Sequence, residues 1–307
     1  RLGTLLPLFP ALLFGTLLAV LGASSAQAGG GPQNVAVLIN TNSADSIEVG
    51  EYYARQRGIP SRNLIRLRCP EEITVSWEVA RTQIVEPIQA HLDREEIRSQ
   101  IDYLVTTQGV PMRVNVGGAG GHFSIVSLHW LLALMETNAA GTEQTRQPRF
   151  GNPYVAADRA FSSTETWGAS DWRMFLVTGL HGFTVEDAKA LVDRSIASDD
   201  GPQGRRFLFQ DANGNAGVRN DSYQRAIQLL EARGVEGVTG HAFPAGTDAV
   251  TNETDVMGYI TGGSYSRLNQ AQLSTNTFVP GAIADPLQSF GAVPRNWVED
   301  GRYSQFP

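Results

Sequence analysis

Polar residues whose chemistry could serve a binding site follow several apolar segments of this sequence. They come directly after segments 35–39, 101–107 and 172–178, each of which has the apolar character of a buried strand. Ligands of an open parallel sheet bind beyond the carboxyl ends of its strands, so these positions form the first candidate site. The candidate ligand-binding residues are Asn40, Asn42, Ser43, Ser46, Gln108, Gly109 and His181.

The turn after segment 35–39 is built of Asn and Ser, where many α/β enzymes have a glycine-rich phosphate loop. Amide and hydroxyl groups beside a helix N-terminus suit an anion or another polar ligand. The same residue types are also the preferred helix N-caps, so plain capping is the alternative interpretation. We therefore predict that the turn caps its helix and borders a polar cleft, and that it does not bind a dinucleotide.

Residues suited to nucleophilic catalysis are few. His181 could act as a general base, and a loop histidine in a strand-to-helix turn is the alternative. The sequence has no G-x-S-x-G motif, which would mark a nucleophilic serine. The one cysteine, Cys69, lies at a predicted strand end, and no histidine lies in a recognisable partner motif. We expect an unreactive thiol there, because a catalytic cysteine needs a base or a lowered pKa.

A possible metal site is the polar segment 211–221. Asp211, Asn213 and Asn215 match the first, third and fifth ligand positions of a calcium loop. The sixth position is Ala216 instead of Gly, and the twelfth is Ser222 instead of a bidentate Glu. The segment therefore favours a polar turn between a strand and a helix, and calcium is kept as an alternative. No other cofactor is expected; His122 and His129, seven residues apart, are too few to define a metal site.

The elements that must position these residues alternate along the chain. Segment 35–39 is consecutively apolar, as in a strand covered on both faces, and the following helix is predicted to end at Gly58 before Pro60. The pattern of strand, helix, strand, helix predicts an α/β fold: a mostly parallel sheet with helices on both faces, as in a doubly wound three-layer sandwich. Further predicted strands are 63–68, 205–211, 235–240 and 256–262, and further predicted helices start at 76, 124, 184 and 221.

The N-terminal 28 residues are predicted to be a signal peptide. An apolar run over 5–21 precedes the small-x-small cleavage pattern 26–28, so we expect export to the periplasm or outside the cell after cleavage following Ala28. A membrane anchor is the alternative, but Pro7, Pro10 and Gly15 make this segment a poor spanning helix. No stable membrane span is expected after cleavage.

Residues 29–307 are predicted to form a single α/β domain. It contains a long irregular segment over 137–170, which is read either as a functional loop or as disorder. The sequence stops without a helix cap or polar tail, so we expect the chain to be truncated at its C-terminus. The net charge of −7 argues against nucleic acid as a partner, because a phosphate backbone demands a basic surface. The expected partner is a polar small molecule or a peptide.

Several motifs together carry a resemblance. The segments "NVAVLINTNSADSIEVGEYYARQRGIPSRNLIRL", "IDYLVTTQGVPMRV", "FGNPY", "RMFLVTGLHGFTVEDAKALVDR" and "FVPGAIADPLQSF" resemble a family of uncharacterised exported bacterial proteins, across 34–307. The opening unit is also similar, more distantly, to legumain- and caspase-like cysteine peptidases. That resemblance implies a caspase-like fold in which the third strand ends in His-Gly and the fourth in a Cys-bearing turn. Here those positions hold Gln108-Gly109 and Gly179-Leu180-His181, so neither the catalytic His nor the catalytic Cys is present.

Two functions follow from these observations. The first is an exported, caspase-like α/β protein that binds a polar ligand or a peptide at the carboxyl edge of its sheet without cleaving it. The alternative is a hydrolase of different chemistry, which would use His181, Asp211 and groups of a further C-terminal segment. In that case the 137–170 segment could act as a lid over the strand ends.

Overall fold

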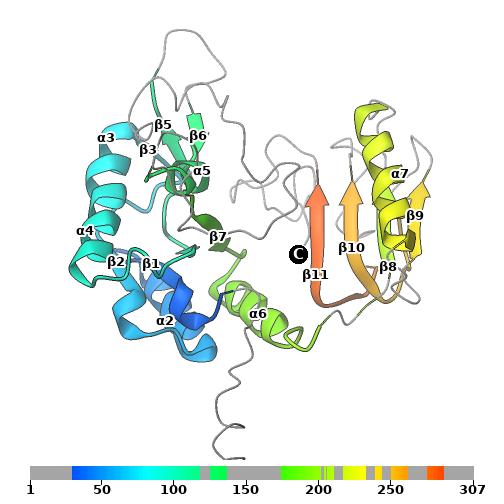
Figure 1. Ribbon diagram of the computed structural model, residues 1–307, viewed down its shortest axis with the longest axis horizontal. Helices are drawn as coiled ribbons and strands as arrows, with labels where there is room; N and C mark the ends of the chain where they lie inside the picture. Colours follow the sequence, from blue (N-terminus) through cyan, green and yellow to red (C-terminus); the bar gives the residue numbers. More distant parts are fainter. Residues whose placement is uncertain are drawn as a thin grey trace, which may run out of the picture.

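The strands form two four-stranded sheets and one three-stranded sheet (Figure 1). The structure, a computed structural model, describes residues 30–117, 125–136, 174–201, 204, 206–210, 217–232, 239–243, 250–261 and 275–286. All strand pairs of the two larger sheets in these residues are parallel. The predicted α/β class with mostly parallel strands is therefore confirmed, and most of its parallel strands are divided between the two larger sheets.

The first sheet has the strand order β2-β1-β4-β7. Its strands are β1 (Val35–Asn40), β2 (Leu64–Leu67), β4 (Tyr103–Thr107) and β7 (Leu176–Leu180). Because all four strands are parallel, their carboxyl ends meet at one edge of the sheet. The predicted ligand-binding residues lie in or directly after these strands, except Ser46, which lies in the first turn of the helix that follows β1.

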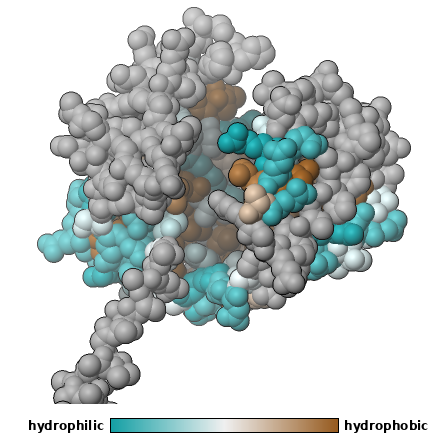
Figure 2. Space-filling view, turned by 45° about the vertical axis from the view of Figure 1, so that its right-hand side comes forward, coloured by the Kyte–Doolittle hydropathy of each residue, from teal (hydrophilic) through white to brown (hydrophobic). Residues whose placement is uncertain are grey.

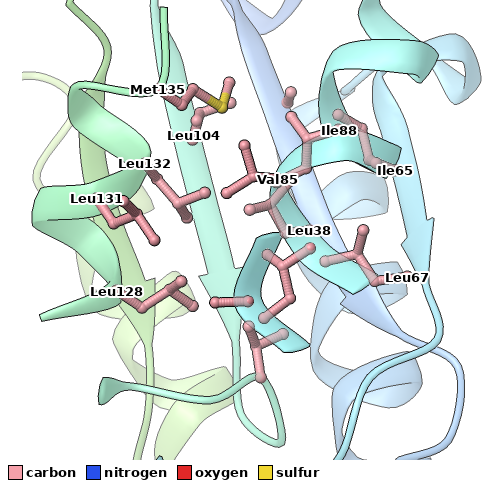
Figure 3. Close-up of a cluster of buried hydrophobic side chains, with 14 of the residues drawn as sticks. Leu38, Ile65, Leu67, Val85, Ile88, Leu104, Leu128, Leu131, Leu132 and Met135 are labelled. Atoms are coloured by element: carbon pink, nitrogen blue, oxygen red, sulfur yellow. The ribbon is translucent and has the colours of Figure 1, made fainter. Parts of the chain in front are cut away.

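One face of the first sheet is covered by α3 (Trp77–Ala80), the π-helical turn η3 (Arg81–Val85), α4 (Glu86–Arg94) and α5 (Leu128–Ala133). Leu38 of β1 and Leu104 of β4 point into this layer, where leucines of α5 and branched residues of η3 and α4 surround them (Figure 3). Burying each such side chain contributes roughly 1.5–3 kcal/mol of transfer free energy. The helix expected from residue 76 is thus divided by a π turn that ends just before Pro87.

The other face is covered by α2 (Ala44–Arg57) and, beside it, α6 (Val185–Ile196). Val37 and Ile39 of β1 pack against α2, which approaches closely because Gly50 has no side chain. A Cβ built on Gly50 would lie 2.6 Å from Cγ1 of Ile39. Helix α2 ends as predicted at Gly58, whose φ of 65° is the left-handed conformation of a helix cap. The first sheet is therefore the middle layer of a three-layer sandwich.

Polar side chains bind α6 to α2. Tyr52 of α2 donates a hydrogen bond of 2.6 Å to Asp193 of α6, and Lys189 of α6 contacts Glu48 at 2.9 Å. Arg57 binds Asp199 and donates to Ser195 at 2.8 Å. Helix α6 is therefore held on the side of the first sheet.

The second sheet has the order β11-β10-β8-β9. Its strands are β8 (Arg206–Gln210), β9 (Thr239–Phe243), β10 (Val256–Thr261) and β11 (Phe278–Pro286). Helix α7 (Gly217–Ala232) covers one face, where Tyr223 packs on Phe209 with ring centroids 5.6 Å apart. Strand β11 lies on the side of this sheet that faces α6 (Figure 1). Helix α6 thus has the first sheet on one side and the second sheet on the other.

The third sheet joins β3 (Thr74–Ser76), β5 (Arg113–Asn115) and β6 (Ile125–Ser127) near α5. Strands β3 and β5 are parallel, and β5 and β6 are antiparallel. Within the residues that the structure describes, none of the helices has the length and apolar character needed to cross a membrane.

Candidate functional site

Asn40, at the end of β1, joins three strand ends. Its side chain is fully buried, and its Nδ2 donates to the carbonyl of Gly109 at 2.8 Å. Its Oδ1 accepts hydrogen bonds from the backbone N–H groups of Asn42 and Cys69, at 3.1 and 3.3 Å. Because both polar atoms are used inside the protein, Asn40 positions the strand ends and has no capacity left for a ligand.

Ser43 and Ser46 are both buried within the protein: Ser46 makes hydrogen bonds with its side chain, and Ser43 packs closely. Ser46 Oγ accepts from the N–H of Asn40 at 2.7 Å and lies 2.5 Å from Thr107 Oγ1, which in turn donates to the carbonyl of Leu38 at 2.9 Å. Ser43 is 2% exposed and packs against Gly109, where an added Cβ would lie 2.3 Å from Ser43 Oγ. These two predicted ligand-binding residues are therefore buried structural groups.

Asn42 and Cys69 border a shallow depression at the end of β2, together with Pro70, Glu71 and Glu72. Asn42 is exposed, and its Nδ2 donates to the Cys69 carbonyl at 3.0 Å. The thiol of Cys69 is buried, and burial raises its pKa to about 12, with a smaller contribution from Glu71. A thiol with this pKa is protonated at neutral pH, so Cys69 is the unreactive strand-end thiol that the sequence predicted.

Gln108, at the end of β4, lies beside the turn that follows β7. Its Oε1 accepts a hydrogen bond of 3.1 Å from the N–H of Gly182, and its Nε2 donates to Asp45 at 3.4 Å. The structure therefore brings the predicted strand-end residues Gln108 and His181-Gly182 together. These are the two positions that the resemblance to cysteine peptidases assigns to the catalytic dyad.

His181 lies in a cluster with Thr106 of β4 and His129 of α5. Thr106 is fully buried, and its Oγ1 lies 2.8 Å from Nε2 of His129 and 3.3 Å from Nε2 of His181. Burial lowers the pKa of His181 to about 4, and the charge of His129 adds to the effect; burial also lowers the pKa of His129. Both imidazoles are therefore neutral at neutral pH.

The Thr106 hydroxyl also limits which ring nitrogen of His181 can carry a proton. It has one hydrogen to donate, and it lies within 3.3 Å of the Thr178 carbonyl as well as of the two imidazoles. Unless that hydrogen goes to His181, the His181 Nε2 must be the protonated nitrogen, which leaves Nδ1 as an acceptor. The cluster also explains Gly179, because a Cβ there would lie 2.7 Å from Nε2 of His181 and 2.8 Å from Thr106 Oγ1.

A cavity of about 720 Å³ opens next to His181, between α6 and β11. Its walls are formed by one face of α6 and by β11, and its remaining lining comes from the turn after β7. The space-filling view shows hydrophobic residues in the hollow between the two halves of the molecule, with a group of hydrophilic residues on its right-hand side (Figure 2). The lining residues that the argument below uses are His181, Asp187, Leu191, Arg194, Ser198 and Ile283. We refer to this space as the α6–β11 cavity.

The β11 wall is shaped by a bulge. Phe278 pairs with Val256 of β10, whereas Ile283 pairs with Gly258, so the four residues 279–282 of β11 lie opposite the single residue Met257 of β10. Gly281 within the bulge has a φ of 78°, and a Cβ there would lie 2.5 Å from Ser198. The segment just after α6 therefore approaches the bulge closely, beside the cavity that both line. Bulges at a sheet edge commonly redirect side chains next to functional sites.

Several exposed apolar side chains line the cavity. Six large hydrophobic side chains of the described chain are exposed, and three of them line it: Phe183 at 39%, Leu191 at 39% and Ile283 at 59%. Contiguous exposed apolar surface of this kind marks a binding site more often than a scattered hydrophobic residue does. Sequence reasoning missed this wall. It considered His129 only as a metal ligand together with His122, and it did not place His129 beside His181.

The residues of the predicted calcium loop are not among those that the structure describes. Asp211, Asn213 and Asn215 lie outside the described residues, as does His122. Within the described part of the chain, no group of three or more His, Cys, Asp and Glu side chains could hold a metal ion.

The fold and the site define an α/β protein with a ligand-sized cavity beside the carboxyl edge of its first sheet. No protein-family model matches the chain, and searches of curated proteins and of solved structures gave no match.

Proposed function

We propose that the protein binds a peptide in the α6–β11 cavity and releases it uncleaved. The observation that carries this proposal is the gathering of Phe183, Leu191 and Ile283 around a cavity that also contains His181. A volume of about 720 Å³ lies within the usual range of ligand pockets. Such pockets combine mostly apolar walls with a few polar groups, and apolar peptide side chains match these walls better than a purely polar molecule would.

Binding without cleavage is supported by the chemistry at the dyad positions. Gln108 has no titratable group, and its Oε1 is already bound to the N–H of Gly182. Cys69 is a buried thiol at the end of β2, on the other side of β1 from β4. The parallel order β2-β1-β4-β7 is compatible with the caspase-like fold that the resemblance implies. We keep that fold, and export after signal-peptide cleavage, as parts of the proposal.

The alternative, a hydrolase that uses His181 as its base, has less support. A general base works best when its pKa lies near the working pH, and burial lowers that of His181 to about 4. A neutral imidazole with this pKa is a poor proton acceptor. Asp211, which this alternative also needs, lies outside the described residues.

The proposal is tested with fluorescein-labelled hexapeptides composed of Ala, Val, Leu and Phe. We expect saturable binding by fluorescence anisotropy and, after overnight incubation, intact peptides by mass spectrometry. The variant Ile283→Ser should weaken binding, because it removes apolar surface from the cavity wall. Leu229→Ser is the matched control, since Leu229 is 51% exposed on α7 and does not line the cavity.

Two results would overturn the proposal. One is the absence of binding to any of these peptides by a folded protein. The other is equal loss of affinity in the Ile283 and Leu229 variants, which would show that binding does not involve the cavity. Cleavage by the wild-type chain and by Cys69→Ala alike would favour the hydrolase.

A further inference from the structure

We infer that the α6–β11 cavity selects the C-terminal end of its peptide, and that Arg194 binds the free α-carboxylate. This inference rests on the proposed function and names the part of the ligand that the cavity recognises. Among the residues that the structure describes, the charged side chains that line the cavity are Asp187 and Arg194. The two differ in their partners: other groups of the protein hold the Asp187 side chain, whereas the Arg194 side chain has no partner among the described residues.

Asp187 is occupied within the protein. Its Oδ2 accepts from the N–H of Thr184 at 3.1 Å and from the Thr184 hydroxyl at 3.0 Å. Its own N–H donates back to Thr184 Oγ1 at 3.1 Å, which completes the capping box at the start of α6. This carboxylate therefore stabilises the helix start and does not neutralise Arg194, which is two helical turns away.

Arg194 has no ion pair or hydrogen bond from its guanidinium to any described residue. The residues three and four positions away along α6 are Ala190, Leu191, Ala197 and Ser198, none of which is acidic. The other basic residues near α6 are paired: Lys189 with Glu48, and Arg57 with Asp199. Arg194 is exposed and lines the edge of the cavity, and a guanidinium without a partner can bind an anion there, because its planar fork matches a carboxylate with two parallel hydrogen bonds.

The position of Arg194 favours a chain end over an internal acidic residue. Ser198 lies just after α6, one turn beyond Arg194, and there the chain approaches the bulge at Gly281, so Arg194 is near the end of the α6 side of the cavity. A chain end placed at Arg194 need not pass this contact, whereas a peptide with an internal acidic residue there would have to continue past it. The α-carboxylate ends the chain, and so it fits this position.

The rest of the cavity complements the last residues of such a peptide. Leu191 and Ile283 offer apolar surface to its side chains. The polar group near the other end is His181, whose Nδ1 is an acceptor when Nε2 donates to Thr106. An acceptor there suits a peptide N–H, and the combination of one anion, apolar side chains and N–H donors describes an apolar peptide C-terminus.

The test compares one apolar hexapeptide in two forms, with a free C-terminal carboxylate and with a C-terminal amide. Both forms carry the same fluorophore at the N-terminus. For the wild-type chain we expect the acid to bind about tenfold more tightly than the amide, the effect of a charge-assisted hydrogen-bonded pair. Arg194→Gln should remove that difference, because it should weaken binding of the acid much more than binding of the amide. Arg194→Lys should retain part of it, because an ammonium is a point charge without the fork.

The outcomes separate this inference from the proposed function. Equal binding of the acid and the amide by the wild-type chain overturns the inference and leaves peptide binding standing. Binding of neither form overturns both. A third peptide, amidated but with an internal Glu, distinguishes the chain end from a side-chain carboxylate: if it binds as tightly as the free acid, the assignment of the chain end is wrong.

Discussion

His129 and His181 meet at one hydroxyl group, although α5 and the turn after β7 bring them from different parts of the chain. Their Nε2 atoms lie 2.8 and 3.3 Å from Thr106 Oγ1, and their ring centroids are 6.4 Å apart. Both rings are kept neutral by burial. Because His181 lines the cavity and contacts Thr106 of β4, its protonation depends on how tightly the first sheet packs around it.

The first prediction concerns the pH dependence of stability. His181 has an ordinary pKa of 6.5 and a folded pKa of about 4, so between these values the unfolded chain binds a proton that the folded chain does not. The free energy of unfolding should therefore rise with pH from about 4 to about 6.5 and then level off, by an amount on the order of 2–3 kcal/mol from His181. His129 should add a smaller change of the same sign.

Urea unfolding between pH 4.5 and pH 7.5 measures this dependence. The variant His181→Gln keeps an N–H donor near Thr106 but does not titrate, so its stability should vary less with pH than that of the wild type. The matched control is His129→Gln, which should retain most of the dependence. An unchanged pH profile in His181→Gln would show that this histidine is not the group that resists protonation.

The second prediction concerns Asn40. Replacing it with Ala leaves the buried carbonyl of Gly109 and the N–H of Cys69 without their partner, so the free energy of unfolding should fall by about 2–4 kcal/mol. Asn42→Ala is the control, since Asn42 is exposed and its side chain makes one hydrogen bond, to the carbonyl of Cys69. Its cost should be about 1 kcal/mol or less. Equal losses in denaturant unfolding would contradict the structural role given to Asn40.

The third prediction compares two glycines that have left-handed backbone conformations. Gly58 has a φ of 65° with open space around its Cβ position, whereas Gly109 has a φ of 88° and an added Cβ would lie 2.3 Å from Ser43 Oγ. Gly58→Ala should cost about 1–2 kcal/mol from backbone strain alone. Gly109→Ala should cost a further 1–3 kcal/mol, approximately, because the side chain of Ser43 must move. If the two variants unfold at the same denaturant concentration, the close approach of Ser43 is wrong.

The fourth prediction concerns the reactivity of Cys69. A buried thiol whose pKa is raised to about 12 should react with Ellman's reagent at pH 8 only when the chain unfolds. We expect one equivalent of released thiolate in 6 M urea and almost none without denaturant. Fast reaction of the folded chain would show that the end of β2 opens or that the thiol is activated.

The sequence predicted the elements of the first sheet because their signals are local. The apolar run 35–39, Gly58 after the helix, and the strand at 101–107 each follow from neighbouring residues. The convergence of Gln108 and His181 also followed, since carboxyl ends of parallel strands meet at one edge. What the sequence did not reveal is which polar groups the protein uses itself: Asn40 is satisfied by the backbone at Gly109, far along the chain.

The cavity could not be predicted for a related reason. The residues of β11 include Pro280 and a glycine in the left-handed region, a combination that argues against a regular strand. Only the register against β10 shows that the segment pairs at both ends and bulges between them. The division of the strands between two sheets depends in the same way on pairing, which hydrophobic periodicity does not specify.

The bulge in β11 has a consequence for the solubility of the protein. Strand β11 is last in the order of its sheet as described, and a long, regular strand in that position is a template on which other chains can add and aggregate. The bulge at 279–282 breaks its register, and Pro280 offers no N–H for pairing. The same irregularity that forms a wall of the cavity therefore protects a partly apolar surface against edge-to-edge association between copies of the chain.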